Sequence, residues 1–578
     1  MATQNNQELA RIFEEMALLY EVKEDKFRQR AYHRGADTLS TLQEDVKDIL
    51  DNGGQAVLEE LPGIGSGLAE KIIEYLKTRH IKEHEKLKKS LPINLEELVS
   101  VEGLGPKTAA LLYKKLKIKN LKDLENAARA GEIRKIKGLG KRTEENILQG
   151  IEFVKSGGGR LLLGDVLPYA RELIKKIKNL EGIEKISEAG SLRRRRETIG
   201  DVDILVAAQN NKKILDYVAE LPDVVKVWDR GPTKLSVHTR GGFDIDVRAI
   251  KKESWGAALQ YFTGNKAHNI HLRKIAISKK YKLNEYGLFR GKKNEVAGQD
   301  EESIYKKLGM EWMPPEVRTD TGEIEAAQNR KLPKLIGYGD IRGDLQIQTD
   351  WTDGAHSTEE MAKEAKKLGL EYIAITDHTK SLGVTGGSDE KRLLKQIKEI
   401  ERVNKKIKGI TVLSGAEVNI LKDGTLDIKD AVLKKLDVVG VSVHSNFNMS
   451  KRDMTNRIMR AMRNPHADIL FHPTGRLINR RAPYELDMEA IIHEAKNTST
   501  ILEINSYPSR LDLKDEYIRM AVRAGVKLCI DTDAHSKEHL KYMEYGIAQA
   551  RRGWAEKEDI VNTKPLEQFL KNLKSGKK

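Results

Sequence analysis

A cluster of aspartates carries the clearest chemical potential in this sequence. Asp201 and Asp203 alternate at the start of a predicted strand, DVDILVAA, so both carboxylates project from one face. A second predicted strand, FDIDVRAI, adds Asp244 and Asp246. Three acids around two Mg²⁺ ions can clamp both the attacking and the leaving oxygen of a phosphoryl transfer. The pattern therefore indicates metal-dependent phosphoryl transfer.

A Gly-Ser turn and four consecutive arginines lie just upstream, in the segment GSLRRRRETIG (190–200). Guanidinium groups match phosphate oxygens in both geometry and charge. A DxD pair alone is common at a solvated strand edge. A DxD pair that follows such an arginine segment indicates a substrate with a triphosphate.

Three short stretches near the N-terminus repeat the order apolar, any residue, glycine, apolar, glycine, each followed by a helical segment. They are LPGIGSGLAEKI (61–72), VEGLGPKTAALL (101–112) and IKGLGKRTEENI (136–147). The glycines permit a tight turn, and the helix that follows presents free backbone N–H groups to a phosphate. The repeats look like helix-hairpin-helix elements, which bind the DNA backbone without reading sequence. The DNA contacts expected from them are at Gly63, Gly65, Gly103, Gly105, Gly138 and Gly140.

The positive charge of the chain is concentrated in its middle. Lysine and arginine number 102 and aspartate and glutamate 87, which gives a net charge of +15. Residues 101–300 hold 41 basic and 25 acidic residues, and the remainder holds 61 and 62. The middle region therefore carries the whole excess, as expected if it faces a polyanion.

The composition excludes several other classes of protein. Hydrophobic residues make up 39% and charged residues 33%, a globular rather than a disordered composition. No apolar run reaches the roughly 18 residues of a membrane span, and the N-terminus lacks a signal peptide's apolar segment. The single cysteine, Cys529, excludes a disulfide framework and a Cys-cluster zinc finger. We expect a monomeric, cytoplasmic protein with no membrane partner.

Together, these motifs resemble the nucleotidyltransferase superfamily over residues 1 to about 315, and within it the family X DNA polymerases that include DNA polymerase beta. The resemblance implies that Asp201, Asp203 and Asp246 are the catalytic acids, because the Asp-x-Arg context selects Asp246 over Asp244. It also identifies the family's YFTG segment at 261–264, where backbone bulk beside the sugar excludes a ribose 2′-OH. The implied contacts to the nucleotide and the nascent base pair are Ser191, Arg194, Gly200, Tyr261, Phe262, Gly264, Asn269 and Arg273.

The same resemblance extends to a lyase-like N-terminal domain. It places the Schiff-base lysine of a deoxyribose-phosphate lyase at Lys71, a chemistry that needs a partly desolvated amine. It also places a pocket for a DNA 5′-phosphate at Arg28 and Tyr32. A third pocket position is Gly67 here, where the animal enzyme has lysine. This departure favours 5′-phosphate binding over lyase activity.

After residue 340, short apolar runs alternate with charged helical segments, which predicts a parallel α/β barrel. Each run ends in a side chain that can bind a metal, and a mixture of imidazole and carboxylate suits Zn²⁺ or Mn²⁺. These side chains are His378, Glu417, His444, His472, Asp533 and His535.

This part of the chain resembles a PHP (polymerase and histidinol phosphatase) domain, the usual C-terminal partner in bacterial and archaeal family X polymerases. There it carries metal-dependent 3′–5′ exonuclease and related phosphodiesterase activity. A PHP domain typically opens with His-x-His, but Gln346 and Gln348 occupy both positions here, while Asp353 persists as an implied ligand. An amide oxygen is a poor ligand for Zn²⁺. We therefore expect the nuclease to be weakened.

We expect a multidomain protein with three kinds of fold. These are an all-α helix-hairpin-helix region, an α+β nucleotidyltransferase palm with a thumb-like subdomain, and a C-terminal α/β PHP barrel. The expected boundaries are 1–90 for the lyase-like domain, 91–155 for the second helix-hairpin-helix region, 156–250 for the palm, 251–315 for the thumb-like subdomain, 316–338 for a linker and 339–578 for the PHP domain.

The expected activity is template-directed DNA synthesis that fills short gaps during base excision repair, with gapped or primer-template DNA and dNTPs as substrates. The expected cofactors are Mg²⁺ or Mn²⁺ at the aspartates and Mn²⁺ or Zn²⁺ at the PHP site. Three alternatives remain: a template-independent nucleotidyltransferase, a polymerase whose PHP domain is an active exonuclease or AP endonuclease, and a non-catalytic DNA-damage scaffold. The intact aspartates disfavour the scaffold.

Overall fold

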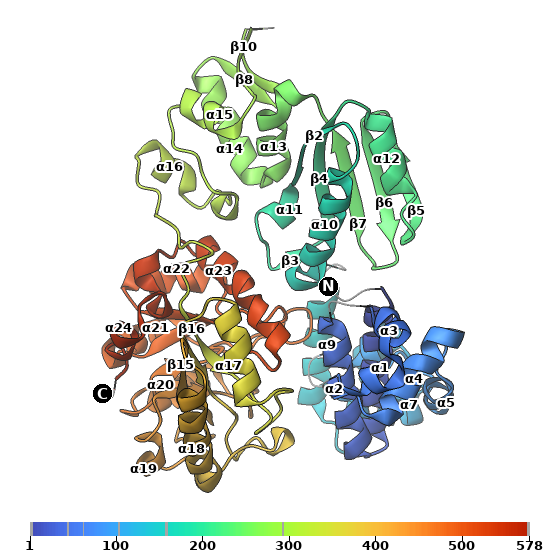
Figure 1. The fold of residues 1–578 in the computed structure, drawn as a ribbon, viewed down its shortest axis with the longest axis vertical. Helices are drawn as coiled ribbons and strands as arrows, with labels where there is room; N and C mark the ends of the chain where they lie inside the picture. Colours follow the sequence, from blue (N-terminus) through green and yellow to red (C-terminus); the bar gives the residue numbers. More distant parts are fainter. Residues whose placement is uncertain are drawn as a thin grey trace.

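The computed structural model describes residues 4–42, 45–61, 63–101, 104–156, 160–291 and 294–574. Figure 1 shows a helical N-terminal part in blue, a sheet with flanking helices in green, and a C-terminal α/β part in yellow to red. These are the three kinds of fold that the sequence predicts, and the fold class is confirmed. Among the described residues, none of the helices combines the length and the hydrophobicity that a membrane span requires.

The N-terminal part is all helical and has one hydrophobic core, which runs from Leu9 to Ile151. Gly63 and Gly138, in the turns before two of its helices, have φ angles of +73° and +94°, which glycine adopts without strain. Gly103 lies outside the described residues. The helices are α1 Gln4–Val22, α2 Lys26–Thr41, α3 Val46–Glu59, α4 Ser66–Thr78, α5 Lys82–Ser90, α6 Leu95–Val99, α7 Pro106–Leu116, α8 Leu121–Arg129 and α9 Lys141–Ser156.

The palm is built on a five-stranded sheet with the order β2-β4-β7-β6-β5. Strands β4 and β7 are parallel, and Asp203 lies opposite Asp246 in their register. Val202, Ile204 and Val206 of β4 point into the core, so Asp201 and Asp203 project from the other face. The elements are β1 Leu161–Leu162, α10 Leu163–Lys178, β2 Ile183–Glu188, α11 Gly190–Arg193, β3 Thr198–Ile199, β4 Asp201–Ala208, α12 Asn211–Ala219, β5 Val224–Arg230, β6 Lys234–Thr239 and β7 Asp244–Ala249.

The thumb follows directly, with its own small core. The segment expected as a linker, 316–338, is partly inside this core, because Val317, Ile324 and Ala327 are buried there. The segment was expected to be a linker because its composition is mostly polar and includes prolines, but these three apolar side chains pack into the core. The elements are α13 Trp255–Thr263, α14 Lys266–Ser278, β8 Tyr281–Asn284, β9 Gly287–Arg290, β10 Asn294–Ala297, α15 Glu301–Lys307, the 3-10 helix η3 Pro315–Val317 and α16 Glu323–Gln328.

The C-terminal part is a seven-stranded parallel sheet in sequential order, β11 to β17. A parallel bridge between Ile347 and Ala534 links its last and first strands, so the barrel is nearly closed. Its strands are β11 Gly343–Ile347, β12 Tyr372–Ile375, β13 Thr411–Asn419, β14 Val438–Ser442, β15 Ile469–Leu470, β16 Ile501–Asn505 and β17 Leu528–Asp531. Its helices are α17 Thr358–Lys367, α18 Glu390–Lys406, α19 Asp430–Leu433, α20 Lys451–Met462, α21 Met488–Thr498, α22 Asp515–Ala524, α23 Met543–Arg552 and α24 Leu566–Leu570.

Candidate active sites

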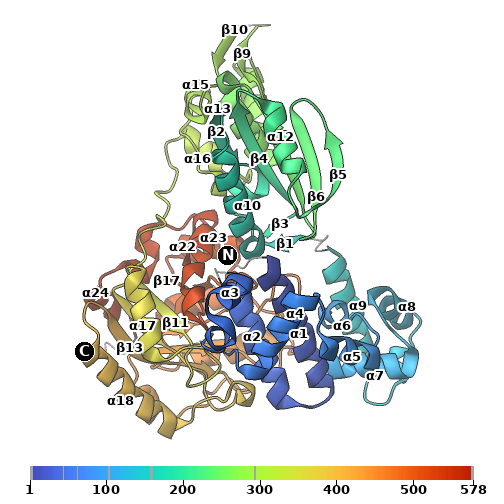
Figure 2. The same ribbon diagram turned by 45° about the vertical axis from the view of Figure 1, so that its right-hand side comes forward.

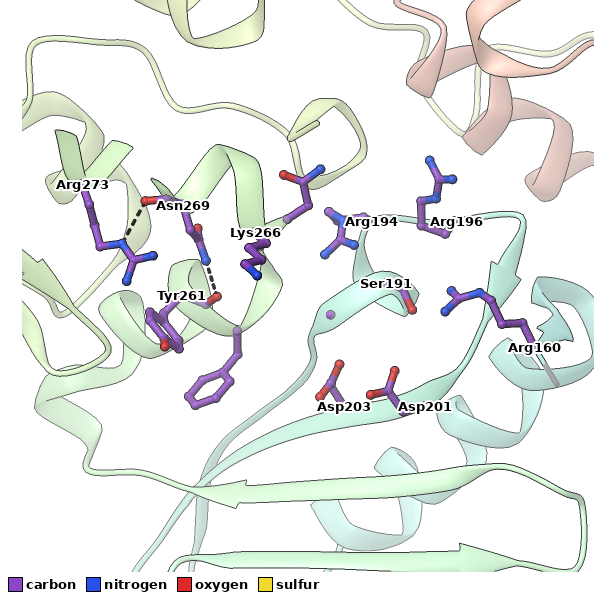
Figure 3. Close-up of a pocket in the computed structure, with 14 residues that line it drawn as sticks. Arg160, Ser191, Arg194, Arg196, Asp201, Asp203, Tyr261, Lys266, Asn269 and Arg273 are labelled. Atoms are coloured by element: carbon purple, nitrogen blue, oxygen red, sulfur yellow. Dashed lines mark hydrogen bonds between the residues drawn. The ribbon is translucent and has the colours of Figure 1, made fainter. Parts of the chain in front are cut away.

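A cleft of about 590 Å³ lies between the palm and the thumb. Figure 3 shows the carboxylates on one side, the arginines above them, and the side chains of α13 and α14 opposite. The lining residues are Arg160, Gly190, Ser191, Arg194, Arg196, Asp201, Asp203, Tyr261, Phe262, Gly264, Asn265, Lys266, Asn269 and Arg273.

The three predicted acids meet at one side of this cleft, which Asp201 and Asp203 line. Asp201, Asp203 and Asp246 each offer a carboxylate oxygen, and these atoms lie within 4.8 Å of one another. Asp246 Oδ1 is buried and has no hydrogen-bond partner among the described residues. A Cβ atom on Gly190 would lie 1.8 Å from Asp203 Oδ2, so only glycine fits beside this carboxylate. The donor set fits divalent cations with a preference for oxygen ligands.

Burial raises the pKa of Asp203 to about 7, and the charges of Asp201 and Asp246 add to the effect. A divalent cation must displace that proton, so we expect the affinity for Mn²⁺ to fall about tenfold per pH unit below pH 7 and to level off above it. Calorimetric titration of the free protein between pH 5.5 and 8.5 measures this dependence. A pH-independent affinity over that range would contradict the placement of a metal at Asp203.

The arginine segment leaves polar atoms open toward the cleft. Ser191 Oγ and Arg194 Nε are buried and have no hydrogen-bond partner within the described ranges. Burial, together with the charges of Arg196 and Arg552, lowers the pKa of Arg194 to about 10. Such a concentration of positive charge is stabilised by an anion, and the open donors fit phosphate oxygens. Gly200 is not among the lining residues. A Cβ atom built on Gly200 would lie 2.9 Å from Nη1 of Arg160, which does line the cleft.

The opposite wall comes from α13 and α14. Asn269 Nδ2 donates to the carbonyl of Tyr261 at 2.7 Å, and Arg273 Nε donates to the carbonyl of Asn269 at 3.2 Å (Figure 3). Gly264 has a φ angle of +68° where α13 ends, which explains the glycine of the YFTG segment.

Five residues that line this cleft were not predicted from the sequence: Gly190, Arg160, Arg196, Asn265 and Lys266. Gly190 and Arg196 belong to the segment with the Gly-Ser turn and the arginines, and Asn265 and Lys266 are the next two residues after the YFTG segment, so these four carried a local signal. Arg160 carried none, because it reaches the cleft only through β1, which pairs with β3.

The predicted 5′-phosphate pocket contains a carboxylate that was also missed. Glu83, in the first turn of α5, lies 3.2 Å from Lys71 Nζ and 3.7 Å from Arg28 Nη1, and accepts a hydrogen bond from Tyr20. Tyr32 stacks on Tyr20 with 5.5 Å between ring centroids. The structure therefore brings Arg28, Tyr32 and Lys71 together, but around an acidic group that the sequence pattern did not reveal. The space at Gly67 is open, since a built Cβ meets nothing within 4 Å.

The hairpin turns are also open. A Cβ atom built on Gly65, Gly105, Gly138 or Gly140 meets nothing within 4 Å, whereas one on Gly63 contacts Arg34 at 3.0 Å. Gly65 and Gly105 are the N-caps of α4 and α7, so the backbone there is accessible to a phosphate.

In the PHP barrel, the predicted ligands gather at the carboxyl ends of the strands. Two groups have ligand atoms within 4.8 Å of one another, Asp353 with His378 and His535, and His378 with Glu417 and His444. His472 Nε2 lies 2.8 Å from Glu417 Oε1. Although burial opposes it, the imidazoles of His378 and His444 hold the pKa of the Glu417 carboxyl well below its usual range. Both groups fit a divalent metal.

Beside these two groups, the site contains the amide side chains of Gln346, Gln348 and Asn505 and the guanidinium of Arg510. Gln348 Nε2 donates to Glu417 Oε2 at 2.8 Å, and Asn505 Nδ2 donates to Gln346 Oε1 and to Asp533 Oδ2 at 3.1 Å each. Arg510 Nε lies 3.2 Å from Asp533 Oδ2. Asp533 is thus brought to the predicted place, but the guanidinium of Arg510 offsets its charge and Asn505 donates a hydrogen bond to the same oxygen. Hydrogen bonds occupy lone pairs of Glu417 and Asp533 that a metal would need.

The palm, thumb and barrel together define a nucleotidyltransferase joined to a PHP domain. Family models match in the same order: a helix-hairpin-helix domain at residues 4–81, a SAM-like helix-hairpin-helix tandem at 95–152, a DNA polymerase beta thumb at 258–319 and a PHP domain at 344–510. The chain is 37% identical to the DNA polymerase/3′-5′ exonuclease PolX of Bacillus subtilis, over 98% of this chain and 99% of that protein. It therefore belongs to the family X DNA polymerases that carry a PHP domain, and it is an enzyme.

Two other likenesses cover parts of the chain. A probable phosphatase of Thermoanaerobacter sp. strain X514 is 30% identical over 40% of this chain and 95% of its own length. A crystal structure of Leishmania infantum polymerase beta, a ternary P/T complex, matches 39% of this chain and 97% of its own, with 24% identity and a TM-score of 0.26.

Proposed function

We propose that this polymerase fills short DNA gaps in base excision repair, with nucleotidyl transfer at Asp201, Asp203 and Asp246. The observation that carries the proposal is the meeting of these carboxylates with open phosphate donors, Ser191 and Arg194, in one cleft. Divalent cations held by the carboxylates would stabilise the charge that develops on the transferred phosphoryl group. Ser191 and Arg194 would bind the triphosphate, and Asn269 and Arg273 would contact the nascent base pair.

A template-independent transferase is the competing activity at the same cleft. The hairpin turns at Gly65, Gly105 and Gly140 do not line the cleft and leave backbone open to a further stretch of DNA, which favours a duplex substrate. Primer extension with and without a template strand separates the two activities. Extension that requires the template supports our proposal, and equal extension without it contradicts it.

The pocket around Arg28 and Tyr32 would bind the downstream 5′-phosphate of a gap. We expect a gap with a 5′-phosphate to be filled about tenfold more efficiently than one with a 5′-hydroxyl, which corresponds to about one charge-assisted hydrogen bond. Glu83 competes with that phosphate for Lys71 and Arg28, so Glu83→Gln should increase the preference and Arg28→Ala should remove it. Single-turnover kinetics on the paired gap substrates measures both effects. Equal preference in wild type and both variants would contradict the pocket.

Lys71 is the candidate Schiff-base lysine of a deoxyribose-phosphate lyase. The lyase step requires the uncharged amine, and Lys71 is in an ion pair with Glu83 that must break first. We propose that lyase activity is slow for this reason. Borohydride trapping of the enzyme on an incised abasic duplex tests it, because Glu83→Gln should trap more DNA than wild type and Lys71→Ala none.

We also propose that the PHP site is a weak 3′–5′ exonuclease, unlike the activity named for the Bacillus subtilis relative. The supporting observation is the bond from Gln348 to Glu417, together with the amide and guanidinium around Asp533. The cluster of His378, Glu417 and His444 would still hold Mn²⁺ or Zn²⁺, but one wall lacks the imidazoles that would hold a neighbouring cation.

A further inference from the structure

The end of helix α23 in the PHP domain contacts both the palm, at a residue that lines the polymerase cleft, and the thumb. Arg552 Nη1 donates to the carbonyl of Arg194 at 3.4 Å, and Arg194 lines the cleft on the palm side. The preceding residue, Arg551, donates from Nε to Glu316 Oε1 at 2.8 Å, in η3 of the thumb. Figures 1 and 2 both show α22 and α23 at the end of the PHP domain that faces the polymerase part. Two consecutive residues of one helix thus join palm and thumb.

On the palm side, the PHP domain holds the arginine segment at several points. The buried Arg552 side chain forms an ion pair with Asp515 of α22, which also lies 3.8 Å from Arg196 Nη1. Arg476 makes a bidentate pair with Glu197, at 2.8 and 3.3 Å. Side chains of the PHP domain therefore contact three residues of the arginine segment, Arg194, Arg196 and Glu197.

On the thumb side, a short series of contacts leads from Arg551 into the cleft. Glu316, its partner, is two residues from Arg318, whose carbonyl accepts a hydrogen bond from the Asn265 backbone at 3.3 Å. Asn265 Nδ2 also donates to the carbonyl of Thr319 at 3.3 Å, and Asn265 lines the cleft. Arg551 is therefore connected to the cleft wall opposite Arg194.

The interface behind these contacts is closely packed. Ile478, Leu511 and Tyr545 of the PHP domain belong to the hydrophobic core of the palm. A Cβ atom on Gly164 of α10 would lie 2.5 Å from Pro508, so the two domains pack at backbone distance. Side chains on a close-packed interface hold their geometry well enough to position a substrate.

We propose that the PHP domain is a positioning element of the polymerase, with Arg552 orienting the triphosphate-binding segment and Arg551 orienting the thumb wall. This role uses none of the PHP metal ligands, so it survives the replacement of the first two histidines by Gln346 and Gln348. It goes beyond the proposed function but rests on the proposed binding of the triphosphate in this cleft.

The test uses the full-length protein with Arg552→Gln, Arg551→Gln and Arg552→Lys. Arg552→Gln removes both the bond to Arg194 and a positive charge, so both effects weaken triphosphate binding. We expect the KM for dNTP and the inhibition constant of pyrophosphate to rise together by about fivefold or more. The dissociation constant for DNA should change less than twofold, and Arg552→Lys should recover most of the loss. Arg551→Gln, which is less buried, should raise the KM for dNTP with little change in the pyrophosphate constant.

The matched control is Arg171→Gln in α10. Arg171 makes a bidentate pair with Glu544 of the same helix α23, at 2.9 and 2.8 Å, and does not line the cleft. Its kinetic constants should stay within twofold of wild type. A purely structural role for Arg552 would lower kcat and the melting temperature while leaving KM and the pyrophosphate constant unchanged, and that result would overturn the proposal. If Arg552→Gln does not fold, an Arg551→Gln variant with a wild-type KM overturns it instead. Full activity of Asp203→Ala would show that the cleft assignment itself is wrong.

Discussion

Asp203→Ala is expected to reduce nucleotide incorporation by ~10³-fold or more, since it removes a carboxylate from a site that must stabilise the transferred phosphoryl group through bound cations. Asp203 lies opposite Asp246 across β4 and β7, and its carboxylate fits against Gly190. The loss should appear in kcat rather than in DNA binding, because the hairpin elements are in a separate part of the molecule. Rapid-quench primer extension measures the rate, and fluorescence anisotropy measures DNA affinity.

Asp244→Asn is the matched control for this experiment. Asp244 is on the same strand as Asp246, but its Oδ1 accepts hydrogen bonds from Trp228 Nε1 at 3.1 Å and pairs with His238 Nδ1 at 2.6 Å. It does not belong to the metal group, so this variant should retain activity close to wild type. Near-normal incorporation by Asp203→Ala, or equal loss in Asp244→Asn, would contradict the assignment of the acids.

Gln346→His combined with Gln348→His should raise 3′–5′ exonuclease activity in Mn²⁺ by about tenfold or more. The change removes the amide that donates to Glu417 and places two imidazoles on the wall of the site next to Asp533. Those imidazoles could hold a cation beside the group of His378, Glu417 and His444, and closely spaced cations make a bound water nucleophilic. Degradation of a 5′-labelled primer without nucleotides measures the activity.

Two controls accompany this double variant. Adding His535→Ala should remove the gained activity, since His535 belongs to the group with Asp353 and His378. Gln348→Asn alone should leave the exonuclease low, because it shortens the side chain without adding a ligand. Rapid primer degradation by the wild type that His535→Ala abolishes would show that the glutamines do not disable the site.

The arrangement of the acids and arginines at the candidate polymerase centre was largely predictable from the sequence, because its geometry is local. Strand alternation alone places Asp201 and Asp203 on one face, and the arginine segment that precedes them is fixed by a short turn at Gly190. The run of ligands at strand ends likewise predicted a parallel barrel, since parallel strands bring their carboxyl ends to one edge. Periodicity and spacing report such local geometry directly.

Contacts between distant parts of the chain were not predictable in this way. Glu83 reaches Lys71 because α5 folds back beside α4, and nothing in its own segment signals a basic partner. From the sequence, Arg551 and Arg552 are expected to be solvent-exposed residues at the end of an amphipathic helix. In the structure, both side chains are largely buried against the polymerase. The amide and guanidinium network around Asp533 depends on side-chain orientation that a sequence pattern does not contain.

The most direct test of the account follows one labelled primer on a one-nucleotide gap with a 5′-phosphate, in Mn²⁺, with the wild-type protein. We propose an intact polymerase cleft beside a PHP domain that supports it and cleaves DNA poorly. We expect that the primer gains one nucleotide when the complementary dNTP is present and stays essentially undegraded over the same time without dNTPs. Rapid shortening of the primer without dNTPs, or no addition with them, would contradict the account.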